Sequence, residues 1–190
     1  MPRIRPRCLL LDTDVIVYLH SAGLWTHVTQ AYDVTIPSFI VHEEAQFFRD
    51  HDGDKHPIDL PSQVESGSVF ELAATPNDLS LLLGHITRNE WEGLHDGERE
   101  ALALVLTSKY GQGLFCSGDK TAIETLAALG FAERGVSLQA VLRATGSDLR
   151  TCAGSCQQYT EEYFKKWSSK GSTRMMTGLG LTSTVFDKHV

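Results

Sequence analysis

Cysteine is scarce in this chain, and its scarcity excludes one class of protein. Four cysteines among 190 residues are too few for a disulfide scaffold, and a chain of this length can bury a core without one. We interpret Cys8 and Cys116, which lie in apolar runs typical of strands, as buried free thiols. Cys152 and Cys156 have no second pair of metal ligands beside them, so we read them as a local pair and not as a metal clip.

Long apolar runs are also missing. The densest, residues 101–106, is far shorter than the roughly 18 residues that suggest a membrane span. Near the N-terminus, three arginines precede an apolar run that stops at Asp12 and is too short for a signal peptide. We therefore expect a cytoplasmic protein without a membrane partner.

The chain has neither an excess of positive charge nor a pattern of zinc ligands. Its formal net charge of -7 argues against a surface that coats a polyanion. A nucleic-acid partner would need local basic contacts or a metal ion. The eight histidines show no HxxxH or HxH spacing, and we assign none of them as a ligand.

What the chain does contain is an alternation of short apolar runs and helical patterns, which predicts an α/β fold. Residues 51–67 are rich in Asp, Gly, Pro and Ser, and we expect them to be irregular. The expected strands are residues 8–11, 33–37, 68–72, 113–117 and 132–136. The expected helices run from residue 15 to a break near Gly23, and over residues 25–32, 39–50, 76–86, 96–110, 120–129 and 137–144.

The composition changes after residue 146, which divides the chain into a domain of residues 1–146 and a C-terminal extension of residues 147–190. In the extension, residues 159–167 suit an aromatic, amphipathic helix, and residues 168–180 are polar and glycine-rich. Its basic and aromatic side chains suit contacts to a single-stranded nucleic acid, or a solvated helix that packs its rings on the domain, and we prefer the second. These side chains are Lys165, Lys166, Lys170 and Arg174 with Tyr163, Phe164 and Trp167.

Carboxylates recur at four places where a helix is expected to begin. Helix capping or the helix dipole explains each of them singly. Parallel α/β topology, however, brings strand ends together and would crowd these like charges at one edge. Such crowding costs free energy unless the acids are protonated or bind a metal ion. The four places are Asp12/Asp14, Glu43/Glu44, Asp96/Glu98/Glu100 and Asp119.

Over residues 8–146 these motifs, in this order, resemble the PIN-domain family of small metal-dependent nucleases. The family pattern is an Asp closing the first strand, a Glu in the helix after a Pro- or Ser-led second strand, a Gly-Glu opening an Ala-rich helix, and an Asp after the fourth strand. The matching motifs are Leu11-Asp12-Thr13, Ile36-Pro37-Ser38-Phe39-Ile40-Val41-His42-Glu43-Glu44, Gly97-Glu98-Arg99-Glu100-Ala101-Leu102-Ala103 and Cys116-Ser117-Gly118-Asp119-Lys120.

The resemblance implies a three-layer α/β/α fold with a central, mostly parallel sheet, and a site that binds Mg²⁺ or Mn²⁺. The implied metal ligands and catalytic residues are Asp12, Glu43, Glu98 and Asp119. We choose Glu43 over Glu44 because its spacing from Pro37 fits better, and Glu44 stays an alternative. Further candidates are Asp14, where the family often has a neutral residue, and Ser117 and Thr13 as supporting hydroxyls.

The implied activity is hydrolysis of RNA phosphodiester bonds by an endoribonuclease, as a stand-alone enzyme or as the toxin of a toxin-antitoxin pair. Mg²⁺ takes oxygen ligands and keeps several waters, which suits a cage of carboxylates with open positions. A metal ion lowers the pKa of its water and shields the charge of the phosphodiester. The resemblance leaves an antitoxin partner and a homodimer open.

Two other readings remain. Asp12-Thr13-Asp14 is similar to the paired aspartates of haloacid-dehalogenase-type phosphatases, with Asp12 as nucleophile and Asp14 as acid. That reading gives Glu43 and Glu98 no role. An inactive PIN-like scaffold that binds partners through its C-terminal extension is the other alternative.

Overall fold

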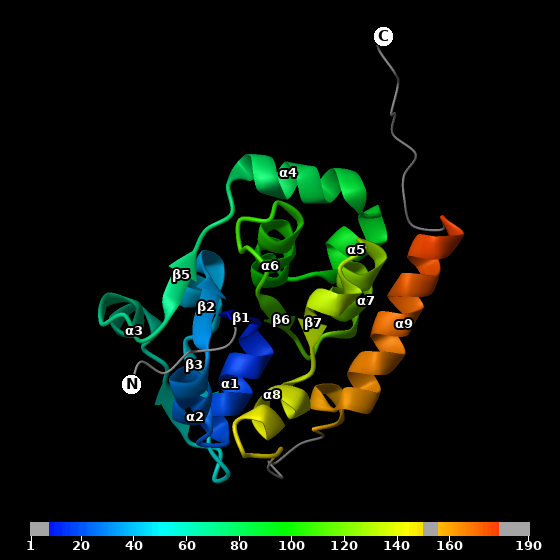
Figure 1. Ribbon diagram of the computed structural model, residues 1–190. Helices are drawn as coiled ribbons and strands as arrows, with labels where there is room; N and C mark the ends of the chain where they lie inside the picture. Colours follow the sequence, from blue (N-terminus) through cyan, green and yellow to red (C-terminus); the bar gives the residue numbers. More distant parts are fainter. Residues whose placement is uncertain (1–7, 150–155, 179–190) are drawn as a thin grey trace, which may run out of the picture.

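A parallel sheet of five strands forms the centre of the molecule (Figure 1). The computed structural model describes residues 8–149 and 156–178. The order of the strands is β5-β2-β1-β6-β7, and each pair of neighbours is parallel. The strands are β1 (Cys8–Leu11), β2 (Asp33–Pro37), β5 (Phe70–Leu72), β6 (Leu114–Cys116) and β7 (Gly135–Val136).

Helices cover both faces of the sheet, and the sheet separates two hydrophobic clusters. Leu9 and Leu11 pack on one face with buried residues of α1, α2 and α8, whereas Leu10 packs on the other with residues of α4, α6 and α7. This alternation confirms the predicted α/β class with three layers. The helices named are α1 (Thr13–Ser21), α2 (Trp25–Ala31), α4 (Pro76–His85), α6 (Asp96–Leu106), α7 (Lys120–Ala128) and α8 (Leu138–Ala144).

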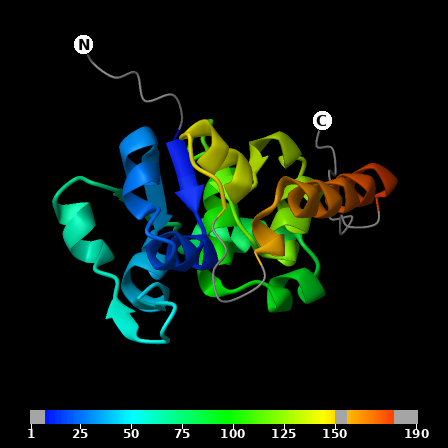
Figure 2. The same ribbon diagram turned by 90° about the horizontal axis from the view of Figure 1, so that it is seen from below.

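The segment between β2 and β5 differs from its prediction. The expected helix 39–50 is a single π-helical turn, η1 (Ile40–Glu44), closed by the hydrogen bond from the Ala45 N–H to the Ile40 carbonyl. An antiparallel hairpin of β3 (Phe47–Arg49) and β4 (Lys55–Pro57) follows it, and then α3 (Leu60–Glu65). The expected irregular segment 51–67 therefore contains a strand and a helix. In Figure 2 this hairpin and α3 lie at the opposite end of the molecule from the C-terminal helix.

The structure has one helix that was not expected and one that is longer than expected. Helix α5 (Arg88–Gly93), which was not expected, begins at a Thr87 cap and precedes α6. After the short turns η2 (Ala132–Arg134) and η3 (Gln157–Tyr159), helix α9 (Glu161–Thr177) continues through the stretch expected to be only polar and glycine-rich.

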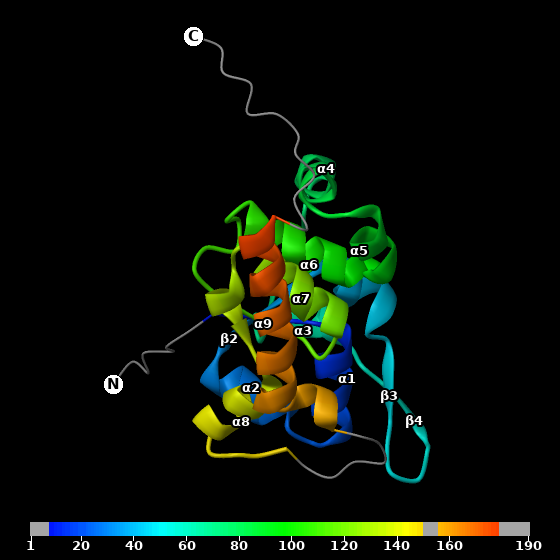
Figure 3. The ribbon, with the colours of Figure 1, turned by 90° about the vertical axis from the view of Figure 1, so that its right-hand side faces the viewer.

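Helix α9 lies along α7, as Figures 1 and 3 show. Gly171 allows this close packing, because a Cβ atom there would lie 2.1 Å from the Glu124 carbonyl oxygen. Arg174 donates to Glu124 of α7 at 2.8 Å and to Glu90 of α5 at 2.7 Å. The extension is thus packed on the domain through a glycine contact and an ion-pair bridge.

The thiol prediction was half right. Cys116 is buried, but Cys8, the first residue of β1, is exposed. Cys152 lies outside the described residues, so the structure does not test the proposed local pair. Among the described residues, no helix combines the length and apolar character needed to cross a membrane.

Candidate active site

The candidate site lies at the carboxyl ends of β1 and β6. These two strands are neighbours at the centre of the sheet, and the chain builds outward from β1 through β2 on one side and from β6 through β7 on the other. Ligands of open α/β sheets bind at such a switch point, outside the carboxyl ends of the strands. Asp12 follows β1 directly, and Ser117 and Asp119 follow β6.

Asp12 is held rigidly and is almost fully buried, with 3% of its surface exposed. Its Oδ2 accepts a hydrogen bond of 2.6 Å from the Ser117 hydroxyl, and its N–H donates to the Cys116 carbonyl. Burial raises the pKa of Asp12 to about 7. The charges of Asp14 and Asp119 act in the same direction, and the bond from Ser117 opposes them.

Glu98 lies in the first turn of α6, near Asp12, and 4% of its surface is exposed. Its Oε2 accepts a hydrogen bond of 2.8 Å from the N–H of His95, which fixes the carboxylate at the helix start. Burial, with the added charges of Asp12 and Asp119, raises the pKa of Glu98 to about 9. The structure thus brings Glu98 into the electrostatic range of both aspartates.

Asp119 caps α7 and is linked to Asp12 through one hydroxyl. Its Oδ1 accepts from the N–H groups of Thr121 and Ala122 at 2.6 and 2.9 Å, as an N-cap does. The N–H of Asp119 donates to the Ser117 oxygen at 3.0 Å, and that same hydroxyl donates to Asp12. Among the described residues, Asp119 Oδ2 accepts no hydrogen bond, so it is the oxygen that can bind a ligand.

Of the two neighbouring glutamates in η1, the structure brings Glu44 to the site. The Thr13 hydroxyl donates to Glu44 Oε2, and the N–H of Gly97 donates to Glu44 Oε1 at 3.1 Å. Glu43 is exposed and makes none of these contacts. The choice of Glu43 rested on its spacing from Pro37, but this segment forms a π turn in which Glu44 is the acid that contacts Thr13 and Gly97. We therefore replace Glu43 with Glu44 in the site.

The remaining acids divide into one at the rim and two with structural contacts. Asp14 is exposed, yet partial desolvation and the charges of Asp119 and Glu44 raise its pKa. Asp96 pairs with Arg99 at 2.6 Å. Glu100 accepts from two backbone N–H groups, at Phe39 and Ala74, and so joins segments of the fold.

Sequence reasoning missed the contribution of Gly97. A Cβ atom at this position would lie 2.4 Å from Ile40 Cγ1 and 2.7 Å from Glu44 Oε2. Any larger residue here would therefore force Ile40 or Glu44 to move where the start of α6 meets η1. The Gly-Glu pair at a helix start was the available signal, but it was read only for its glutamate.

The donor set fits a hard divalent cation. Asp12, Glu44, Glu98 and Asp119 offer carboxylate oxygens only, the ligands that Mg²⁺ and Mn²⁺ prefer. They form an open arrangement. Their ligand atoms do not form a group of three within 4.8 Å of one another. Within residues 8–149 and 156–178, such a group is found at Asp50, His51 and Asp52 of the hairpin. Water would therefore have to complete the coordination of a cation at the candidate site.

The hairpin triad has an ordinary structural explanation. Asp50 accepts from the N–H groups of Asp52 and Asp54 and pairs with His56, which are contacts of a tight turn. We therefore place the candidate site at the sheet edge.

Comparisons of the chain with protein-family models, with curated proteins and with solved structures found no match.

Proposed function

We propose that this protein is a metal-dependent endoribonuclease of the PIN-like type, with Mg²⁺ or Mn²⁺ held by Asp12, Glu44, Glu98 and Asp119. One observation carries the proposal: Asp12, Glu98 and Asp119 lie within electrostatic range of one another at the carboxyl edge of the sheet, and Glu44 accepts hydrogen bonds from Thr13 and Gly97, the neighbours of two of them. The raised pKa values of Asp12 and Glu98 support it, because a divalent cation would relieve the crowding that contributes to them. The choice of RNA over DNA rests only on the resemblance to the PIN-domain family, and the role as a toxin stays a prediction.

Hydrogen bonds orient two of these acids. The Ser117 hydroxyl orients Asp12, and the first turn of α7 orients Asp119 so that Oδ2 faces away from the cap. Asp119 or Glu98 would orient the attacking water, and Glu98 would do so in its ionised form, which a bound cation would favour by lowering its raised pKa. A bound cation would supply a lowered pKa for that water and a counter-charge for the phosphodiester.

The test is cleavage of single-stranded RNA by the purified protein with Mn²⁺ or Mg²⁺. We expect Asp12→Asn, Asp119→Asn and Glu44→Gln each to lose activity while the fold is retained, and EDTA to stop the wild type. Glu43→Gln is the matched control, since it removes the neighbouring charge from an exposed side chain, and it should stay active. Full activity in EDTA would overturn the mechanism.

Two further measurements separate the alternatives. A phosphatase with Asp12 as nucleophile forms a covalent acyl-phosphate, whereas attack by water does not. Trapping such an intermediate from a small phosphate ester would replace the nuclease proposal. Metal binding without any turnover would favour the scaffold.

A further inference from the structure

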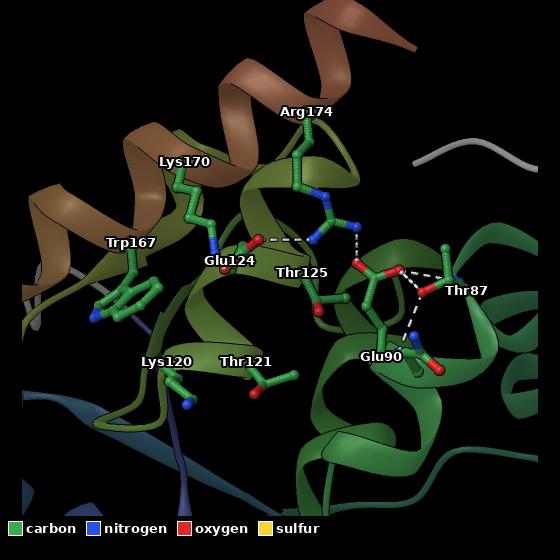
Figure 4. Close-up of a pocket in the computed structure, with 10 residues that line it drawn as sticks. Thr87, Glu90, Lys120, Thr121, Glu124, Thr125, Trp167, Lys170 and Arg174 are labelled. Carbon is green, nitrogen blue, oxygen red and sulfur yellow. Dashed lines mark hydrogen bonds and ion pairs between the residues drawn. The ribbon is translucent and has the colours of Figure 1, made fainter. Parts of the chain in front are cut away.

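A polar cavity of about 450 Å³ lies beside the candidate site, between α5, α7 and α9 (Figure 4). This volume is in the range of small-ligand pockets. Lys120 and Thr121, which line it, directly follow Asp119 in the chain. From there the cavity extends along the face of α7 to Thr125, roughly 8 Å at the rise of an α-helix. The cavity therefore begins where the acidic site ends.

The charges of the cavity favour a single anionic group. Three cations, Lys120, Lys170 and Arg174, and two anions, Glu90 and Glu124, line it, which leaves one positive charge. Arg174 and Lys170 are paired with the glutamates. Among the described residues, Lys120 forms no ion pair, so its ammonium group is available to a ligand.

The cavity also offers an aromatic surface and a buried polar atom. The half-buried ring of Trp167 lies on the same side as Lys120 in Figure 4, with the Lys166 and Lys170 ammonium groups 5.0 and 4.9 Å from its centroid. An aromatic ring with cations around it is the arrangement that single-stranded nucleic acids use for stacking and phosphate contacts. Thr125 Oγ1 lies in the lining, buried, with no hydrogen-bond partner in the described part of the chain.

We propose that this cavity is a nucleotide subsite that holds the nucleotide next to the scissile bond. The phosphate of the nucleotide binds Lys120, and its base stacks on Trp167. Stacking displaces Lys166 or Lys170 from the ring, and that ammonium group can then contact the RNA backbone. This inference rests on the proposed nuclease function and names how the substrate is held. A strongly acidic centre repels RNA, so a cationic contact directly beside it gives the strand a place to bind.

The experiment is binding of a labelled, short single-stranded oligoribonucleotide in EDTA, measured by fluorescence anisotropy. Loss of the stacking ring in Trp167→Leu should weaken binding roughly 5- to 150-fold, and Trp167→Phe should restore most of it. Lys120→Ala should weaken binding and lower the slope of log affinity against log salt by about 0.7, as one lost phosphate contact does. Lys165→Ala, an exposed lysine of α9 outside this cavity, is the matched control and should bind like the wild type.

The outcomes distinguish the subsite from the nuclease. RNA cleavage with Mn²⁺ together with unchanged binding by Lys120→Ala and Trp167→Leu would overturn the subsite and leave the nuclease standing. Binding that depends on both residues, without cleavage under any metal, would support nucleotide binding in this cavity and overturn the nuclease, together with the position of the nucleotide beside a scissile bond. Lys120 is exposed at the start of α7, so its variant tests the proposal even if Trp167→Leu disturbs α9.

Discussion

Replacement of Glu98 by Gln should stabilise the metal-free protein near neutral pH. The carboxyl group is buried, and its pKa is raised from 4.5 to about 9 in the folded state. At pH 7 the unfolded chain has lost this proton and the folded chain keeps it. That difference disfavours folding by about 3 kcal/mol, and Gln, which has no proton to lose, removes it.

The effect has a defined pH window. Below about pH 4.5 the acid is protonated in both states, so wild type and Glu98→Gln should melt together. Between pH 4.5 and pH 9 the folded state holds the extra proton, so the wild type should lose stability relative to the variant as pH rises. At pH 7 the variant should melt higher by roughly 6–12 °C, at about 2–4 °C per kcal/mol for a chain of this size.

Thermal melts of both proteins in EDTA and in Mn²⁺, from pH 4 to pH 8, measure this effect. Mn²⁺ at a hundredfold excess over Kd should stabilise the wild type by about 2.7 kcal/mol and the variant by less, because one ligand is gone. Glu43→Gln is the control and should follow the wild type at every pH. An advantage of Glu98→Gln that is the same at pH 4 and pH 7 would refute the reasoning, since burial of an ionisable carboxyl group cannot produce it.

Variants at three other positions test the cap of α7 and the packing of α9 by thermal unfolding. Asp119→Ala should cost about 1 kcal/mol because it removes the α7 cap, whereas Asp119→Asn should keep most of that stability; equal melts would argue against the cap. Gly171→Ala should destabilise the protein by roughly 1–3 kcal/mol, because its Cβ would clash with the α7 backbone; an unchanged melt would mean that α9 packs differently. Arg174→Ala should cost roughly 1–3 kcal/mol, because Glu90 loses its ion-pair partner and Glu124 loses one of its two; a neutral result would show that the bridge contributes nothing.

The sheet and most of its strands could be predicted because their signals are local. The run Cys8–Leu11 is apolar on both faces, as a central parallel strand must be, and it stops at an acid. Asp12, Glu98 and Asp119 could be found for the same reason, since each follows a strand or begins a helix. The structure brings these three into electrostatic contact, and metal binding and activity remain predictions.

The parts that sequence reasoning missed depend on contacts between distant segments. No local pattern distinguishes the π turn at Ile40–Glu44 from an α-helix, and the contacts of Ile40 and Glu44 with Gly97 join segments that are far apart in the sequence. Helix α9 continues past Trp167 because α7 accepts it at Gly171, although its own sequence is polar there. Local propensity was overridden in both places by tertiary contacts.

The central position of β1 has a consequence for how the protein is made. Its pairing with β2 involves a nearby segment, but its other edge pairs with β6, and the bond between Asp12 and Ser117 spans 105 residues. At about 5–20 residues per second, synthesis leaves that apolar edge without its partner for roughly 5–20 s. The carboxylates that follow β1 and β6 come together only after these two strands have paired. The candidate site therefore cannot form in a nascent chain until β1 and β6 have paired.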